Sequence, residues 1–286
     1  MTTTLWAGLT MGAIYALVAL GYNLTLILSG VINFANAQYL VIGAFIAVWG
    51  LGAGLPLPAV VLLAAVVAGL AALLTERIAI RPLRGVGDHT ELVTTLGVST
   101  IIMGFALLWF GPDPIGVSVM PADSLDLFGG RVRLNEIVLL LMAVVITVAA
   151  HHLVHRTRLG LAGLARSEDP EAASLRGIDV RALSIVGFVA AGLAGGLIGP
   201  LVAQKTYAVA TLGLLMALKG FIALAVGGVG SITGSLVGGV VVGLIEALAA
   251  RYLGNDFGAV SVIVLLFAVL LLRPDGILGR RSVRVV

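Results

Sequence analysis

The sequence contains no cysteine, and only 11% of its 286 residues are charged, whereas soluble domains carry about 25% charged residues. The missing thiols exclude disulfides, thiolate metal sites and cysteine nucleophiles. The scarcity of charge excludes a disordered chain and a water-soluble globule, because too few charged side chains are present to cover a folded surface. Hydrophobic residues make up 60% of the chain. This balance indicates an integral membrane protein.

No charged residue precedes Glu76, and the first 75 residues hold about three spans, since a helix needs about 20 residues to cross the hydrocarbon core. The apolar runs predict an all-α, polytopic membrane protein with about nine transmembrane segments (eight to ten) in one domain, residues 1–286. Because the run at 212–229 contains Lys219 and ends in glycines, it is the candidate for a re-entrant or broken helix. The predicted spans are 5–28, 33–50, 57–75, 92–110, 134–153, 182–203, 212–229, 232–250 and 257–272.

The distribution of Lys and Arg predicts the orientation of the chain. Alternating crossings place 12 of the 17 basic residues on one side, and the positive-inside rule makes that side cytoplasmic. The carboxyl terminus is therefore predicted inside and, with nine spans, the amino terminus outside. The cytoplasmic set is Arg77, Arg81, Arg84, Arg156, Arg158, Arg166, Arg176, Arg181, Arg273, Arg280, Arg281 and Arg284. The remaining residues are Arg131, Arg133, Lys205 and Arg251 outside, and Lys219 within the membrane.

Nucleic-acid binding, metal binding and catalysis receive little support. The net charge is only +3, and the basic residues form no face interleaved with aromatics, so the lipid bilayer rather than nucleic acid is the expected surroundings. His151 and His155 share a helix face as two metal ligands would, but nothing nearby supplies further ligands. Contact with lipid headgroups is the favoured interpretation of these histidines. No metal site and no catalytic residue are predicted.

The long hydrophilic segment at 155–181 contains a short helix with a signal at each end. Asp169 is a predicted N-cap, Pro170 suits the first helical position, and the carboxylate of Glu171 is favoured by the helix dipole. Gly177 is expected to supply the left-handed C-cap. A helix of about two turns is marginal alone, so it is expected to dock on another protein. The predicted docking helix comprises Asp169, Pro170, Glu171, Ala172, Ala173, Ser174, Leu175, Arg176 and Gly177.

Polar residues within the predicted spans are candidates for a translocation path. Capping and helix–helix hydrogen bonds are the competing, and for the asparagines and glutamine the favoured, interpretation. A Lys219–Glu246 ion pair is one hypothesis, because intramembrane charges are costly unless paired; snorkelling toward an interface is the favoured alternative. The path candidates are Asn33, Asn36, Gln38, Thr94, Thr95, Ser99, Lys219, Gly228, Gly230, Ser231 and Glu246.

Glycine spacing raises two further alternatives. The stretch at 227–234 lacks the lysine that a P-loop needs, and it is either a flexible break that lines the path or a tight turn between two packed helices. Glycines recur at four-residue steps at 192–199 and 230–243, a spacing that allows close approach of helix backbones in lipid. Packing within one subunit is favoured here over a dimer seam.

The segment Glu171-Ala172-Ala173-x-x-x-Gly177 resembles the EAA motif of ABC importer permeases, whose short coupling helix sits in a cleft of the ATPase subunit. Over nearly the whole chain, the sequence resembles the LivH-type permeases of branched-chain amino acid ABC importers. Two positions depart from that pattern: Asn36-Ala37-Gln38 stands where His-Gly-Glu is usual, and the proline of the longer EAA consensus is absent. The resemblance is carried by residues 12–21, 31–35, 81–85, 94–99, 227–234 and 273–276.

The resemblance implies a permease subunit of the bacterial inner membrane that moves branched-chain or similar small neutral amino acids into the cytoplasm by alternating access. It implies as partners a second homologous permease in a heterodimer, two ABC ATPase subunits and an extracytoplasmic solute-binding protein. It also implies that this chain is not an enzyme and binds no cofactor, while the ATPase subunits use ATP and Mg. The alternatives are an ABC permease for urea or short amides and, in a different class, an autonomous channel or ion-coupled carrier.

Overall fold

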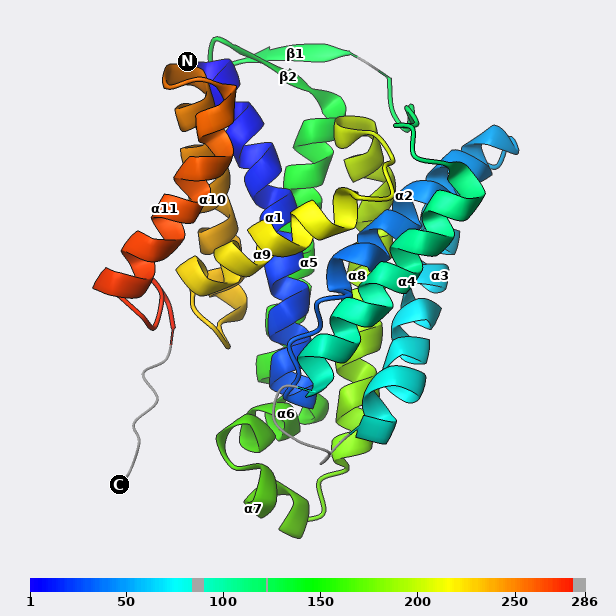
Figure 1. Ribbon diagram of the computed structural model, residues 1–286, viewed down its shortest axis with the longest axis vertical. Helices are drawn as coiled ribbons and strands as arrows, with labels where there is room; N and C mark the ends of the chain where they lie inside the picture. Colours follow the sequence, from blue (N-terminus) through cyan, green and yellow to red (C-terminus); the bar gives the residue numbers. More distant parts are fainter. Residues whose placement is uncertain (84–89, 122, 280–286) are drawn as a thin grey trace.

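The computed structural model describes residues 1–83, 90–121 and 123–279, which form a bundle of helices with a small β-hairpin at one end (Figure 1). Turns at Thr75–Ile80 (a π-helical turn, η1) and Arg81–Leu83 (η2) follow the third helix. The strands are β1 (Ser124–Leu127) and β2 (Gly130–Arg133). The helices are α1 (Thr2–Ser29), α2 (Asn36–Gly52), α3 (Leu57–Leu74), α4 (Thr90–Phe110), α5 (Leu134–Arg156), α6 (Arg158–Glu168), α7 (Pro170–Leu175), α8 (Val180–Thr206), α9 (Leu212–Gly227), α10 (Ile232–Tyr252) and α11 (Asn255–Leu272).

The predicted all-α membrane architecture is confirmed. Among the described residues, seven helices are long and apolar enough to cross a membrane, and α2 and α9 are shorter apolar helices. Each of the nine predicted spans coincides with one of these helices. The helix α9, which covers the candidate for a re-entrant or broken segment, has 16 residues and crosses the face of the bundle obliquely (Figure 1).

Helix α1 forms the core of the bundle. Its side chains Ile14, Tyr15, Leu20 and Tyr22 are fully buried, and it packs against α5, α8, α9 and α10. Most of its length is therefore shielded from lipid by protein on several sides. Tyr22 donates a hydrogen bond to the carbonyl of Ala217 in α9 at 3.0 Å.

Glycines allow α1 and α10 to touch through their backbones. A Cβ at Gly239 would lie 2.4 Å from the amide nitrogen of Ala16, and one at Gly243 would lie 2.3 Å from that of Gly12. Neither distance leaves room for a side chain, so the seam requires glycine at both positions. Close backbone packing supplies the van der Waals contact that holds helices together in lipid. The prediction that these glycines pack within one subunit is confirmed.

The first residue of α2, Asn36, lies beside Val18 and Gly21 of α1 and not beside the end of that helix. The amide of Asn36 donates to the carbonyl of Val18 at 3.2 Å, and Gly21 lies directly against the Asn36 side chain. The first turn of α9 comes to the same region, because Gly213 packs on Gln38. Two short apolar helices therefore begin inside the bundle.

The two ends of the bundle carry different elements. Thr2 donates to the carbonyl of Gly129 in the hairpin turn at 2.8 Å, and Arg251 donates to Thr4 at 3.0 Å. These contacts gather the amino terminus, the hairpin and the end of α10. At the other end Arg166 of α6 lies against Gly30, the C-cap of α1, and α7 projects beyond the bundle (Figure 1).

The predicted separation of basic residues fits these ends. The described arginines of the 75–83 and 155–181 segments lie at the α7 end (Figure 1), and Arg131, Arg133, Lys205 and Arg251 lie in elements of the opposite end. Arg84 and three predicted cytoplasmic arginines near the carboxyl terminus lie outside the described residues. Those three are Arg280, Arg281 and Arg284.

Two elements were not predicted. The hairpin pairs Ser124 with Arg133 and Leu127 with Gly130, and both residues of its turn, Phe128 and Gly129, have positive φ angles of 53° and 74°. Such a two-residue turn matches the twist of antiparallel strands, but a phenylalanine is an unusual occupant. The helix α6 is capped by Thr157, whose hydroxyl accepts from the Gly160 amide at 3.1 Å.

Candidate functional site

The beginning of α7 has the predicted cap. The Asp169 carboxylate accepts hydrogen bonds from the amides of Glu171 and Ala172 at 3.0 and 2.9 Å, and Pro170 is the first helical residue. These bonds satisfy backbone donors that a helix start otherwise leaves unpaired. The predicted N-cap is confirmed.

The end of α7 has the predicted left-handed glycine. Gly177 has a φ angle of +80°, and its amide donates to the carbonyl of Ser174 at 3.0 Å, while the Ile178 amide donates to Ala173 at 3.2 Å. This pair of bonds is a Schellman motif, which closes a helix and fixes the direction of the chain after it. The helix itself has six residues, so it is a short rod that is capped at both ends.

Most of α7 is open to its surroundings. Ala173 is buried, whereas Glu171, Ser174, Leu175 and Arg176 are exposed. The side chain of Leu175 is 88% exposed in a segment that projects from the bundle (Figure 1). The surface of α7 therefore combines one exposed apolar side chain with charged and polar ones.

A connection of side chains and backbone joins α7 to the core helix. The amide of Asp169 donates to the carbonyl of Ala165 in α6 at 3.1 Å. On α6, Gly163 packs against Leu28 near the end of α1, where an added Cβ would lie 2.4 Å from the leucine side chain. Contacts therefore run from α7 through α6 to the end of α1.

A second site lies within the bundle, where α1, α9 and α10 meet. Lys219 of α9 and Glu246 of α10 form an ion pair with an N···O distance of 2.5 Å. The hydroxyl of Tyr15 donates to the other Glu246 oxygen at 2.7 Å and accepts from Lys219 at 3.2 Å. The hypothesised pair is present. Pairing lowers the free-energy cost of keeping each charge away from water.

The polar path candidates of α2 and α4 bond to one another and to the backbone. Asn33 accepts from the Ala35 amide at 3.0 Å and donates to the Tyr39 hydroxyl at 3.0 Å. Gln38 donates to Ser99 at 3.1 Å, and the Thr95 hydroxyl accepts from the Phe34 amide at 3.2 Å.

Two oxygens in this cluster have no hydrogen-bond partner among the described residues. They are Oδ1 of Asn36 and Oε1 of Gln38, and both side chains are buried. Thr94 stands apart from the cluster, because its hydroxyl donates back to the Thr90 carbonyl of its own helix at 2.8 Å. The structure thus joins Gln38 to Ser99 and the Phe34 backbone to Thr95, bonds Asn36 to α1, and leaves Thr94 bonded within its own helix.

The glycine-rich candidate stretch forms a tight turn between α9 and α10. Gly228 and Gly230 have positive φ angles of 112° and 80°, and the Ser231 hydroxyl caps α10 by accepting from the Gly234 amide at 3.0 Å. Asn23 of α1 holds the turn: it accepts from the Gly230 amide at 2.7 Å and donates to the Ser231 carbonyl at 2.9 Å.

The turn is also covered by the segment after α11. The amides of Ile277 and Leu278 donate to the carbonyls of Val226 and Gly227 at 2.8 and 2.9 Å, and Gly276 packs on Gly228. Of the two alternatives for residues 227–234, a flexible break or a tight turn between packed helices, the structure shows the tight turn, and its backbone groups bond to protein.

Sequence reasoning missed two residues of these sites and one residue of a separate ion pair. Tyr15 and Asn23 belong to an apolar stretch of α1. The only signal in the sequence is that each carries a polar group within a long apolar run. Glu136 was also missed; it forms an ion pair with Lys205 and accepts from the Arg133 amide at 3.2 Å. This second pair joins α5 and α8 at the hairpin end.

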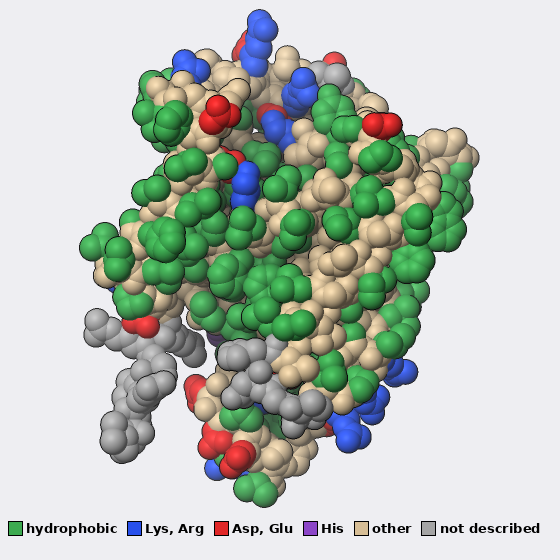
Figure 2. Space-filling model, in the orientation of Figure 1, with side chains coloured by type: hydrophobic (Ala, Val, Ile, Leu, Met, Phe, Trp, Pro, Cys, Tyr) green, Lys and Arg blue, Asp and Glu red, His purple; other side chains and the backbone are tan. Residues whose placement is uncertain are grey.

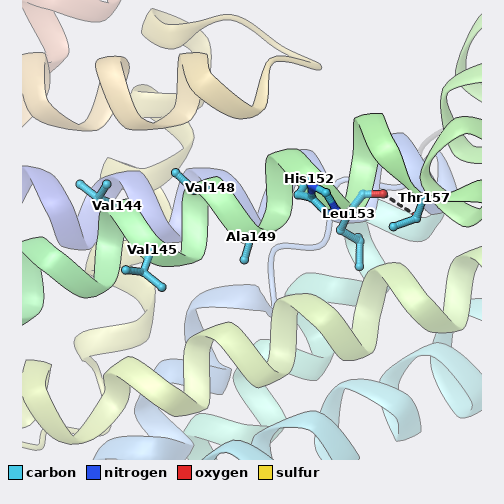
Figure 3. A pocket seen from close by; sticks show the side chains of 7 residues that line it. All are labelled: Val144, Val145, Val148, Ala149, His152, Leu153 and Thr157. Atoms are coloured by element: carbon cyan, nitrogen blue, oxygen red, sulfur yellow. Dashed lines mark hydrogen bonds between the residues drawn. The ribbon is translucent and has the colours of Figure 1, made fainter.

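The outer side of α5 carries an apolar groove of about 610 Å³. In Figure 3 the valines and Ala149 follow one side of α5, and Thr157 donates to the Leu153 carbonyl at 2.6 Å. His151 and His155 stack with ring centroids 4.2 Å apart; within the described residues no group of three metal-binding side chains occurs. The groove is lined by Val144, Val145, Val148, Ala149, His152, Leu153 and Thr157.

Comparison with solved structures finds the same fold in PsaBC from Streptococcus pneumoniae in complex with Fab. The TM-score is 0.52 at 14% identity, and the match covers 94% of this chain and 91% of that chain. At this identity the match concerns the fold alone.

Sequence comparison finds relatives along nearly the full length. The chain is 30% identical to the high-affinity branched-chain amino acid transport system permease protein LivH of Escherichia coli strain K12 and 33% identical to BraD of Pseudomonas aeruginosa. Each match covers 98% of this chain and 96% of the relative. Residues 4–272 also match the family described as the permease component of the branched-chain amino acid transport system. These matches show that the chain belongs to that family of transport permeases, which are not enzymes.

Proposed function

We propose that this chain is the membrane-spanning permease subunit of an ABC importer that moves branched-chain or similar small neutral amino acids into the cytoplasm. The observation that carries the proposal is α7, a short helix capped by Asp169 and Gly177 that projects from the bundle with Leu175 exposed. Because both ends of α7 are capped, the helix is expected to keep its shape when a partner subunit pushes on it. Membership in the transport family supports the choice of substrate.

The proposed assembly contains a second homologous permease in a heterodimer, two ABC ATPase subunits and an extracytoplasmic solute-binding protein. The ATPase subunits bind and hydrolyse ATP with Mg, and this chain binds neither. In the proposed orientation, within a bacterial inner membrane, the α7 end faces the cytoplasm, the carboxyl terminus is inside and the amino terminus is outside. The excess of arginine at the α7 end supports this orientation.

The proposed mechanism is alternating access driven through α7. Closure of the ATPase subunits on ATP moves α7, which moves α6 through the bond between the Asp169 amide and the Ala165 carbonyl. The contact of Gly163 with Leu28 passes the displacement to α1. Because α1 packs on α8, α9 and α10, its shift rearranges the helices around the solute. Of the path candidates, Asn33, Asn36, Gln38, Thr95, Ser99, Lys219 and Glu246 are proposed to line the path, whereas Thr94 bonds within its own helix and Gly228, Gly230 and Ser231 form the α9–α10 turn.

The test of coupling replaces exposed residues of α7 in the assembled transporter. Glu171→Lys places a positive charge at the positive end of the helix, and Gly177→Val puts a β-branched residue at a φ angle of +80°. Each variant is expected to insert normally and to lose substrate uptake while the ATPase subunits continue to hydrolyse ATP. The measurement is ATP hydrolysis and amino-acid uptake in the same proteoliposomes.

The matched control is Glu168→Lys, an equal change of charge on an exposed residue of α6 just before α7, which is expected to keep uptake. Normal uptake by both α7 variants would contradict the proposal. Uptake by the purified chain without ATPase and binding-protein partners would instead favour an autonomous channel or carrier.

A further inference from the structure

We propose that Lys219 and Glu246 form the site where the translocation path recognises the charged backbone of a free amino acid. In this proposal Lys219 binds the substrate carboxylate and Glu246 binds its ammonium group. The inference rests on the proposed transport of amino acids and adds the residues that distinguish a zwitterion from an uncharged solute.

The position of the pair suits a site inside the membrane. Lys219 lies at the middle of α9, and Glu246 lies in the second half of α10. Tyr15, a buried residue of the core helix, holds both by hydrogen bonds, and the Lys219 ammonium lies 5.3 Å from the centre of its ring. Three helices therefore fix one cation and one anion side by side.

The pair is accessible from one side. The exposed fractions of the Lys219 and Glu246 side chains are 21% and 19%. Figure 2 shows positively and negatively charged atoms together in a recess of the upper half of the face that α9 crosses. Ionisable groups in membrane proteins face a protein interior or a water-filled cavity rather than lipid. In this proposal the exposed side of the pair faces the solute path rather than lipid.

The hydrogen-bonding capacity of the pair is incompletely used. An ammonium group has three donors; among the described residues, Lys219 donates to Glu246 and to Tyr15, which leaves one N–H. A carboxylate accepts about four hydrogen bonds, and Glu246 accepts one on each oxygen in this part of the chain. The unused groups are thus a donor on the cation and acceptors on the anion.

An amino acid matches these unused groups. Its carboxylate and ammonium are attached to the same carbon, so they can lie alongside the protein pair with opposite charges facing each other. The pair need not separate, and the substrate charges gain partners in a region where unpaired charges are costly. Urea or a short amide carries no net charge at either group and gains much less.

One exposed apolar side chain shares the helix face of Lys219. Leu215 of α9 is more than half exposed, and it lies four residues before Lys219, hence on the same helix face. An aliphatic substrate side chain finds apolar contact there while the charged end binds the pair. The site therefore favours neutral amino acids with aliphatic side chains.

The experiment measures ATP-dependent uptake of leucine into proteoliposomes that contain the complete transporter. Lys219→Met and Glu246→Gln each remove one charge at similar volume and are expected to lower uptake about 10-fold to 100-fold at low leucine concentration, the loss expected for one charged hydrogen-bond partner. Glu136→Gln is the matched control, since it removes a charge from the ion pair with Lys205, and it is expected to keep uptake.

The double variant with Lys219→Glu and Glu246→Lys separates recognition from structure. It retains an ion pair and both bonds to Tyr15, so thermal stability in detergent is expected to match that of the wild type even if the single variants fold poorly. Uptake is expected to stay at least about 10-fold low, because the charges that meet the substrate are reversed and its side chain no longer faces Leu215. Full uptake by this double variant would show a structural pair and overturn the inference.

The outcomes for the two proposals differ. If the wild-type complex shows no ATP-dependent uptake of any amino acid, the proposed function fails. If the wild type transports leucine and Lys219→Met and Glu246→Gln do so with unchanged rate and half-saturation, the inference about the pair fails and the proposed function stands.

Discussion

At the scale of single residues, buried polar side chains act as ties between helices that are distant in the sequence. Asn23 is fully buried in α1, yet it bonds to the Gly230 amide and the Ser231 carbonyl of the α9–α10 turn and to the Ser235 hydroxyl of α10. Without Asn23 the Gly230 amide would lose its acceptor in an apolar interior, which costs more than the bond itself contributes.

Replacement of Asn23 by alanine is therefore expected to destabilise the protein. The variant leaves the Gly230 amide without its acceptor, and we expect a loss of about 1–3 kcal/mol. Thermal denaturation of the detergent-solubilised protein measures the effect. Asn255→Ala is the control, because Asn255 is exposed at the start of α11; equal melting temperatures for the two variants would contradict the role of Asn23.

At the scale of elements, the structure depends on which helices approach through glycine. The α1–α10 seam has no space for side chains at Gly239 and Gly243, whereas Gly104 of α4 has nothing within 4 Å of the place where a Cβ would be. The same residue type thus has a packing role in α10 and none in α4.

A valine at each position makes the difference measurable. Gly243→Val pushes the backbone of α1 away from α10, and overpacking of this kind costs about 1–3 kcal/mol or more. Gly104→Val, the matched control, is expected to change stability by a few tenths of a kcal/mol, within the range of surface substitutions. The yield of monodisperse protein after heating and gel filtration reports the contrast, and similar behaviour of the two variants would refute the tight seam.

The elements that could be predicted from the sequence are those with local signals. Span length and apolar runs located nine helices, and the caps at Asp169 and Gly177 located α7, because each signal lies within the element it defines. The hairpin and α6 were missed: Phe128 replaces the usual turn residues, and α6 is too polar for a span.

The candidate sites were only partly predictable because their contacts are non-local. Tyr15 lies 231 residues from Glu246 and 204 from Lys219 in the sequence, and no spacing rule connects such positions. The charges of Lys219 and Glu246 were conspicuous in an apolar chain, so the pair could be hypothesised. The aromatic residue that holds it could not.

At the scale of the whole molecule, the two ends of the bundle are chemically distinct, and the proposed orientation assigns them to opposite sides of the membrane. The natural absence of cysteine makes this testable without removing any native residue. Ser174 of α7 and Ser124 of the hairpin are both exposed, and each lies at one end.

Single cysteines at these positions are expected to react from opposite sides. A membrane-impermeant maleimide should label Ser124→Cys in intact cells with a permeabilised outer envelope and Ser174→Cys only in inside-out vesicles. Each variant serves as the control for the other. Labelling of Ser174→Cys from outside would overturn the proposed orientation and, with it, the coupling role of α7.

The covering of the α9–α10 turn by Ile277 and Leu278 has a consequence for biogenesis. These residues emerge from the ribosome only after α11. The carbonyls of Val226 and Gly227 therefore lack these hydrogen-bond partners until about fifty further residues have been synthesised. During that interval the turn relies on Asn23 alone for side-chain support from α1. The docking of residues 276–278 on the α9–α10 turn thus follows the synthesis of α11.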